Sequence, residues 1–149
     1  MGEENLLLNK QLCFRLYKTS RKMTRLYQPI LNKLNITYPQ YLVMLVLWEH
    51  KTIDFKELSD ILELKTGTLT PIVKKLVDLD YITKDKNTED NRKIDVSLTD
   101  EGLNIKKQAV TVPNDIADKI GLTFEKYQQY VKVLDEIGRD LDEAEKHNQ

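Results

Sequence analysis

Cys13 has the most distinctive side-chain chemistry in this 149-residue sequence, because it is the only cysteine. A single cysteine can form neither an internal disulfide nor a multi-cysteine metal site. The plain interpretation is a small hydrophobic side chain buried on a helix. A helix capped by Asn5 or Asn9 would instead place Cys13 in its first turns, where the partial positive charge of the helix end favours a reactive thiolate.

Tyrosine hydroxyls follow Cys13 along the chain. Tyr17 lies four residues on, so in a helix its hydroxyl can border the sulfur. Tyr27 lies fourteen residues on, which is about 21 Å in a straight helix that rises about 1.5 Å per residue. Tyr38 is the next phenol. Tyr27 therefore cannot touch Cys13 of its own chain, and a contact between them requires a second chain.

A different set of polar side chains shares one face of a helix that we expect from Thr66 to Asp80. The other face is apolar and carries Leu69, Ile72, Val73, Leu76 and Leu79. Hydroxyl groups and lysines bind phosphates or base edges, so the polar face is suited to DNA. Its side chains are Thr66, Thr68, Thr70, Lys74 and Lys75.

The elements around this helix favour the same interpretation. Asp54 and Glu57 form a capping-box pattern that begins a short helix, and a turn leads from it into the polar-faced helix. From Tyr81 to Leu98 the apolar period changes to two, which predicts a β-hairpin with a polar tip at residues 86–92. This order is typical of a winged helix-turn-helix. The alternative is a helical hairpin and sheet buried for stability alone.

A buried helix is expected between the N-terminal region and this motif. Thr37 and Gln40 form a capping box with Pro39 in the first turn, which is a strong helix start. The apolar run that follows predicts a central helix with Met44 and Trp48 in the core.

Long helices are expected at both ends of the chain. The first runs from Leu6 to Lys33, with a kink near Leu26 because Pro29 interrupts it. Helices after the hairpin start at Thr99 and Thr123, with a break at Pro113 and a stop at Gly121. Both end helices carry more apolar surface than one chain covers, which predicts pairing with a second copy.

Composition and charge limit the possible functions. With 40% hydrophobic and 32% charged residues the chain has a folded, soluble composition. The net charge is −1 overall but +5 in residues 1–33 and only +2 in residues 65–93, so DNA affinity would depend on a few placed cations. We expect a cytoplasmic protein without a membrane partner, because the sequence shows no signal peptide or membrane-spanning run.

Five groups of residues together form a recognisable set of motifs. They are Gln11-Leu12-Cys13-Phe14 with Tyr17, residues 34–41, residues 67–71 with Lys74-Lys75, Asp90-x-Arg92 and Ser97-Leu98-Thr99. On these motifs the sequence, up to about Val112, resembles the MarR family of winged-helix regulators, and most closely its organic hydroperoxide resistance repressor branch. L-C-F and T-Y-P-Q are typical of the thiol-sensing branch, and D-x-R and S-L-T of the whole family.

The resemblance implies a mainly α fold with a small β-hairpin wing, in which residues 1–36 and 100–149 form a homodimer layer and residues 37–99 bind double-stranded DNA. Arg92 would enter the minor groove, steadied by Asp90. The family usually has an acidic residue at the position of Lys65. The lysine opposes the helix dipole but can contact a phosphate. The DNA-binding residues are then Lys65, Thr66, Thr68, Thr70, Lys74, Lys75, Asp90, Arg92 and Lys93.

The resemblance also implies that Cys13 is a redox sensor, with Tyr17 beside it and its thiolate bonded by Tyr27 and Tyr38 of the other subunit. An organic hydroperoxide would oxidise Cys13 to a sulfenic acid. A low-molecular-weight thiol would then cap it, or a cyclic sulfenamide would form, and the repressor would release its operator. No cofactor, metal or enzymatic activity is expected.

Other functions stay open on the residues alone. A MarR-type regulator could respond to a phenolic ligand, or a broader thiol-based regulator could control virulence or global gene sets. A thiol peroxidase is less favoured, because no resolving cysteine is present. His50 and His147 are isolated, and no metal-ligand or phosphate-loop motif is found.

Overall fold

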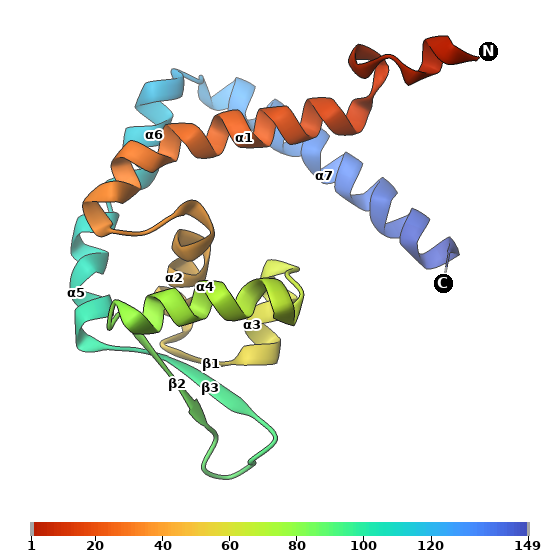
Figure 1. Ribbon diagram of the computed structural model, residues 1–149. Coiled ribbons are helices and arrows are strands. Elements are labelled where there is room, and N and C mark those ends of the chain that lie inside the picture. The colour runs from red at the N-terminus through yellow and green to blue at the C-terminus, as the bar shows by residue number, and fades with distance from the viewer. Residues whose placement is uncertain (1, 149) are drawn as a thin grey trace. The chain divides into compact units, whose positions relative to one another are not determined.

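The computed structural model describes residues 2–148. The chain divides into two compact units, with the boundary between residues 113 and 114. The fold is mainly helical with one small antiparallel sheet, as expected (Figure 1). The predicted boundaries between the dimer layer and the DNA-binding part, after residues 36 and 99, remain a prediction. The helices and strands are α1 (Leu12–Leu31), α2 (Tyr38–His50), β1 (Thr52–Asp54), α3 (Phe55–Leu62), α4 (Thr66–Asp78), β2 (Ile82–Lys86), β3 (Ile94–Leu98), α5 (Asp100–Ala109), α6 (Val112–Ile120) and α7 (Phe124–His147).

The first helix is shorter than the predicted span from Leu6 to Lys33. Two 3₁₀ turns, Glu3–Leu6 and Leu8–Lys10, precede α1, and its N-cap is Gln11. The expected caps at Asn5 and Asn9 are therefore wrong. Extended backbone at Leu7 and Gln11 interrupts the helical pattern that the leucines suggested. Pro29 lies inside α1, which continues to Leu31 before a 3₁₀ turn at Asn32–Leu34.

The buried central helix is confirmed. Gln40 accepts a hydrogen bond from the Thr37 backbone N–H at 2.9 Å, as in the predicted capping box, and Pro39 occupies the first turn. Met44 is fully buried and Trp48 nearly so. The core of residues 1–113 forms around α2, which contacts α1, α3, α4 and α5.

The sheet contains a strand that the sequence did not reveal. β1 pairs antiparallel with β3, which also pairs with β2, so the strand order is β1-β3-β2. Asp54 precedes α3 as predicted but makes no side-chain cap there; its Oδ1 instead accepts from the Ile94 N–H at 3.3 Å. The predicted capping box with Glu57 is therefore wrong, because the strand contact uses the aspartate.

Two buried hydrogen bonds join the sheet end to the helices. The Tyr81 hydroxyl donates to the Leu34 carbonyl at 2.9 Å, and the Trp48 indole N–H donates to the Gly102 carbonyl at 2.9 Å. A Cβ at Gly102 would lie 2.1 Å from the Tyr81 carbonyl oxygen, so α5 approaches the Tyr81 backbone as only glycine permits.

The second unit contains most of α6 and all of α7. The predicted helix start is confirmed, since the Thr123 hydroxyl accepts from the Lys126 N–H at 3.2 Å. Gly121 has φ +67°, which suits the turn between the helices. No described residue of α7 is buried, and its exposed apolar side chains are Phe124, Tyr127, Tyr130, Val131, Val133, Leu134 and Leu141.

Candidate functional site

Helix α4 places its polar side chains on an outward face, as predicted. Leu69, Val73 and Leu76 are fully buried and hold α4 against α2 and β2. The predicted residues Thr66, Thr68, Thr70, Lys74 and Lys75 are all exposed. A contiguous face of hydroxyl and ammonium groups is therefore available to a large polar partner.

Internal contacts already orient part of this face. The Thr70 hydroxyl donates to the Thr66 carbonyl at 2.8 Å, and Lys74 pairs with Asp78 at 3.2 Å across one helical turn. Lys65 is the N-cap of α4, and its side chain is exposed. Both the lysine and the helix end are attractive to an anion such as a phosphate.

The hairpin tip between β2 and β3 is held by Asn87, which sequence reasoning missed. Its side-chain carbonyl accepts from the N–H groups of Glu89 and Asp90, each at 2.9 Å, and its amide donates to Asp95 at 3.0 Å. Asparagine in a polar loop is a frequent turn former through such bonds, so the residue type was an available signal. The tip is thus an ordered turn.

Asp90 and Arg92 form the predicted pair at this tip. The Arg92 Nε and a terminal nitrogen donate to the two Asp90 carboxylate oxygens at 3.1 and 3.3 Å. The guanidinium and backbone N–H of Arg92 hold the pKa of Asp90 below its usual range, with a smaller contribution from Lys93. The Arg92 side chain is nevertheless 90% exposed, so it can reach a partner.

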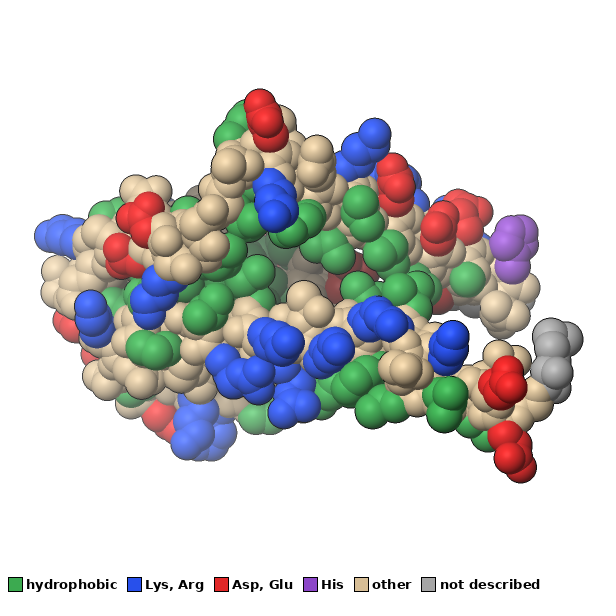
Figure 2. Space-filling model, turned by 90° about the horizontal axis from the view of Figure 1, so that it is seen from above, with side chains coloured by type: hydrophobic (Ala, Val, Ile, Leu, Met, Phe, Trp, Pro, Cys, Tyr) green, Lys and Arg blue, Asp and Glu red, His purple; other side chains and the backbone are tan. Residues whose placement is uncertain are grey.

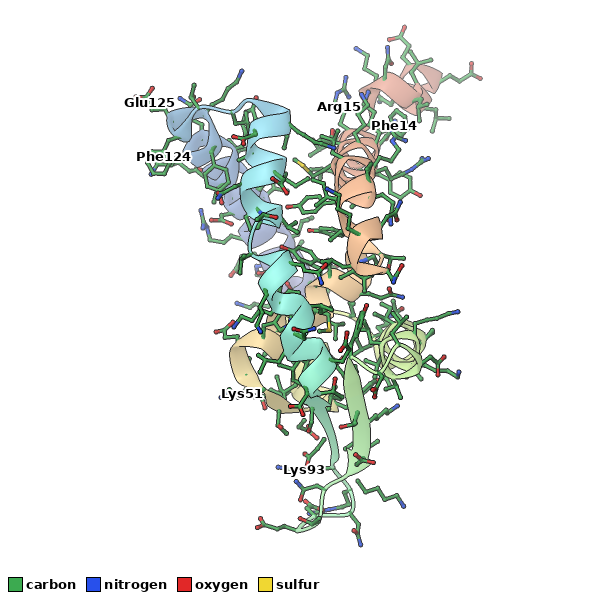
Figure 3. The ribbon with its side chains drawn as sticks, turned by 90° about the vertical axis from the view of Figure 1, so that its left-hand side faces the viewer. Phe14, Arg15, Lys51, Lys93, Phe124 and Glu125 are labelled. Atoms are coloured by element: carbon green, nitrogen blue, oxygen red, sulfur yellow. The ribbon has the colours of Figure 1, made fainter. Side chains whose placement is uncertain are left out.

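Helix α4 and the wing, which is the hairpin of β2 and β3, lie together and away from α1. Figure 1 shows the wing projecting from residues 1–113 at the end opposite α1, with α4 between them. Figure 3 shows the same separation, with Phe14 and Arg15 on α1 far from Lys93 in the wing. A partner that contacts α4 and the wing therefore does not need α1.

Cys13 is exposed and is the second residue of α1. It thus lies in the first turn of a twenty-residue helix, although the cap differs from the predicted one. Tyr17, one turn further, is 63% exposed, and the Arg21 guanidinium lies 5.4 Å from its ring centroid. The sulfur and this phenol are both accessible from outside the chain.

Tyr27 and Tyr38 are brought together, from α1 and α2. Their ring centroids are 4.9 Å apart, and Tyr41 lies 5.9 Å from Tyr27 and 6.3 Å from Tyr38. Burial raises the pKa of Tyr38; burial and the two neighbouring phenols raise the pKa of Tyr41. The hydroxyls therefore stay protonated near neutral pH, as hydrogen-bond donors must.

The predicted redox residues thus fall into two groups. Cys13 and Tyr17 lie near the start of α1, whereas Tyr27 and Tyr38 lie near its end, and α1 runs unbroken between them. The separation is about 21 Å along the helix axis. Tyr41, which the sequence assigned only to the core run, joins the second group.

A groove of about 290 Å³ lies next to the tyrosine group, between α2 and α5. Its lining includes the apolar and aromatic side chains of Tyr41, Leu45, Trp48 and Val110 and the charged side chains of Glu49 and Lys106. Within residues 2–148, no cluster of His, Cys, Asp or Glu could hold a metal ion. None of the helices described there is long and apolar enough to span a bilayer.

Comparison with known proteins places these features in context. The family described as transcriptional regulator SarA/Rot matches residues 25–109. The chain is 47% identical over 113 residues to the organic hydroperoxide resistance transcriptional regulator of Bacillus subtilis, covering 76% of this chain and 77% of that protein. It is 30% identical over 138 residues to the regulator MgrA of Staphylococcus aureus, covering 92% and 94%.

Solved structures agree with the fold. Reduced AbfR bound to DNA aligns with a TM-score of 0.80 at 31% identity, covering 97% of this chain and 99% of that chain. AbfR is a protein of Staphylococcus epidermidis. Its form with a disulfide formed aligns with a TM-score of 0.62, covering 97% and 96%.

Proposed function

This chain belongs to the MarR family of winged-helix transcriptional regulators, and from that premise we propose that it is a cytoplasmic, homodimeric repressor that senses organic hydroperoxides through Cys13. In this proposal α4 reads the major groove of a pseudo-palindromic operator. Arg92, held by Asp90, enters the minor groove, and Lys65, Lys74, Lys75 and Lys93 neutralise phosphates. The exposed hydroxyls of Thr66, Thr68 and Thr70 contact phosphates or base edges.

One observation carries the sensing part of the proposal, namely the division of the redox residues along α1. Cys13 is exposed in the first turn of α1, so its sulfur is accessible from outside the chain. The phenols that could bind the sulfur, Tyr27 and Tyr38, gather at the far end of the same helix and are half-buried. A second copy in antiparallel contact along α1 would bring each sulfur to the Tyr27–Tyr38 pair of its partner.

The chemistry of sensing follows the usual oxidation of a thiolate. The sulfur attacks one oxygen of the hydroperoxide, the O–O bond breaks, and the alkoxide that leaves takes a proton to become an alcohol. Cys13 is then a sulfenic acid, oxidised as the peroxide is reduced. A low-molecular-weight thiol replaces the sulfenic hydroxyl, which leaves as water, and a mixed disulfide remains. The bulk of the mixed disulfide and the loss of the thiolate move the two reading heads apart, where each reading head is formed by residues 37–99 of one chain.

A single titration tests this proposal. A duplex selected by the reduced protein from a random pool serves as the operator, and cumene hydroperoxide is added with and without a small thiol. We expect DNA release to track the oxidation of Cys13 by mass spectrometry. Cys13→Ser should bind DNA equally well and stay bound under oxidant; release of that variant would overturn the sensor assignment.

Mixed dimers test the division of the site between chains. When a Cys13→Ser chain pairs with a Tyr38→Phe chain, one sensing site is complete if the residues come from different subunits, and none is complete if they come from one. We expect these mixed dimers to keep one site that is oxidised at the wild-type rate. The matched control places both substitutions on one chain and pairs it with wild type.

The α2–α5 groove favours a second candidate, regulation by a phenolic ligand. Its volume of about 290 Å³ is close to the lower limit of small-molecule sites. A salicylate-dependent rise in melting temperature that persists in Cys13→Ser would support this function. No rise at saturating salicylate would exclude this ligand and leave the thiol mechanism untouched.

A further inference from the structure

Helix α1 carries a row of cations that the reading of an operator by α4 and the wing does not use. We define the α1 basic row as Arg15, Lys18, Arg21, Lys22 and Arg25. All five side chains are exposed, and Figure 2 shows blue side chains gathered in a row along this helix. Between Glu4 and Glu49 the sequence contains no acidic residue, so the row has no local counter-charge.

The contacts of these cations leave their charge available. Lys18 lies over the Phe14 ring at 5.2 Å and Arg21 over the Tyr17 ring at 5.4 Å, and Arg15 donates to the Gln11 carbonyl at 3.4 Å. The ion pairs found within residues 2–148 all involve other side chains. Ring faces and carbonyl oxygens orient cations without neutralising them.

The row also remains free when the apolar face of α1 is covered. Leu12, Leu16, Met23, Leu26 and Ile30 form the apolar stripe of the helix. At about 100° per residue, the centre of the basic row lies about 120° around the helix from the centre of that stripe. A second copy packed on the stripe therefore leaves the row exposed to solvent.

The spacing of the row fits a phosphate backbone. From Arg15 to Arg25 the helix advances about 15 Å. Each strand of a duplex presents one phosphate per roughly 3.4 Å of axis, so about four phosphates pass over that length. A compact acidic protein surface would be expected to offer scattered carboxylates instead of a continuous line of charge.

We propose that the α1 basic row is a second, sequence-independent DNA-binding surface, which holds a duplex segment at the end of residues 1–113 opposite the wing. Figure 3 places Arg15 and Lys93 at opposite ends of residues 1–113, so the α1 basic row is separate from the wing. The surface binds a second duplex or a distant segment of the same DNA. This inference does not depend on the redox chemistry of Cys13.

Salt-dependent binding to a random 20-base-pair duplex, followed by fluorescence anisotropy, tests the proposal. A row variant replaces Lys18, Arg21, Lys22 and Arg25 by Gln, which preserves helix propensity. A reading variant carries Lys74→Gln, Lys75→Gln and Arg92→Gln. A charge-matched control replaces Lys126, Lys132, Arg139 and Lys146 of α7 by Gln, and circular dichroism confirms that each variant is folded.

We expect the reading variant to retain duplex binding at low salt, and the row substitutions to weaken that residual binding at least about tenfold. If all four cations contact phosphates, the slope of log K against log salt should fall by up to about 3.6. The α7 control should change neither quantity by as much.

Three outcomes would overturn the proposal. The row variant could bind the duplex as wild type does, or the α7 control could lose as much affinity as the row variant. Alternatively, poly-glutamate could compete as well as a duplex of equal charge, which would identify an acidic protein as the partner. A failure here leaves operator binding through α4 intact, because the selected operator is measured in parallel with the row variant.

Discussion

The reading head, formed by residues 37–99, and the two ends of the chain differ in how much of their apolar surface is buried within one chain. Most apolar side chains of α2 are buried, and the Tyr81 hydroxyl and the Trp48 indole N–H are each paired with a backbone carbonyl. In contrast, α7 buries no side chain, and Leu12 at the start of α1 is 60% exposed. The reading head therefore forms its apolar core within one chain, whereas the ends leave large apolar side chains exposed.

The largest expected loss of stability in this part of the chain comes from a substitution at Gly102. In Gly102→Ala the new Cβ would meet the Tyr81 carbonyl at 2.1 Å, so α5 must shift away from the sheet. We expect the free energy of unfolding to fall by about 3 kcal/mol or more, as measured by urea denaturation.

Gly138→Ala in α7 is the matched control for this substitution. Nothing lies within 4 Å of its added Cβ, so the change should stabilise the helix by about 0.5–1 kcal/mol. Equal effects at the two glycines would contradict the close approach at Gly102.

The ends of the chain are tested by Leu134→Glu in α7. Leu134 is 56% exposed in one chain, so the substitution should be nearly neutral for a monomer. If a second copy covers it, the dimer buries two unpaired charges, and its dissociation constant should rise by about a hundredfold or more. Sedimentation equilibrium measures the constant, and Lys132→Glu controls for charge. An unchanged dimer would place the interface elsewhere.

A smaller effect is expected from Tyr81→Phe. The substitution removes the buried hydrogen bond to the Leu34 carbonyl and leaves that oxygen unpaired. Unfolding should become easier by about 1–2 kcal/mol. Tyr130→Phe, at a 48% exposed position of α7, should change the free energy of unfolding very little. A similar loss at both sites would argue against the buried bond.

The smallest effect concerns the wing tip and pH. Because Arg92 lowers the pKa of Asp90, the contribution of their contact is present above the unfolded-state pKa of this carboxyl and is lost as pH falls through its lower folded-state pKa. NMR titration should find Asp90 titrating below an ordinary aspartate, and Arg92→Gln should raise that pKa. Operator binding should show no Asp90-dependent change between pH 6 and 8.

The reading head was predictable because its signals are local. The stripe of Leu69, Val73 and Leu76, the cap at Thr99 and the two-residue period of the hairpin each fix an element without knowledge of its neighbours. β1 was missed because three residues carry no readable period, and it forms only by pairing with β3.

The errors at the N-terminus and in the site have a similar physical origin. Leu6 to Leu8 extend a helical pattern that the backbone at Leu7 and Gln11 does not follow. The Tyr27–Tyr38–Tyr41 group depends on how α1 packs on α2, so sequence spacing alone placed Tyr41 only in the core. The Asp90–Arg92 pair was predictable, because a single residue separates its members and a turn brings them together.

The position of Trp48 gives the molecule a built-in optical reporter. It is the only tryptophan, its indole is fixed to the Gly102 carbonyl, and the Tyr41 ring lies 6.3 Å from it. Tyr41 also touches the two phenols proposed to receive the sulfur. The fluorescence of Trp48, excited selectively at the red edge of the absorption band, therefore reports on the region between the sensing phenols and the reading head. Stopped-flow fluorescence can follow the coupling of these two regions in the unlabelled protein.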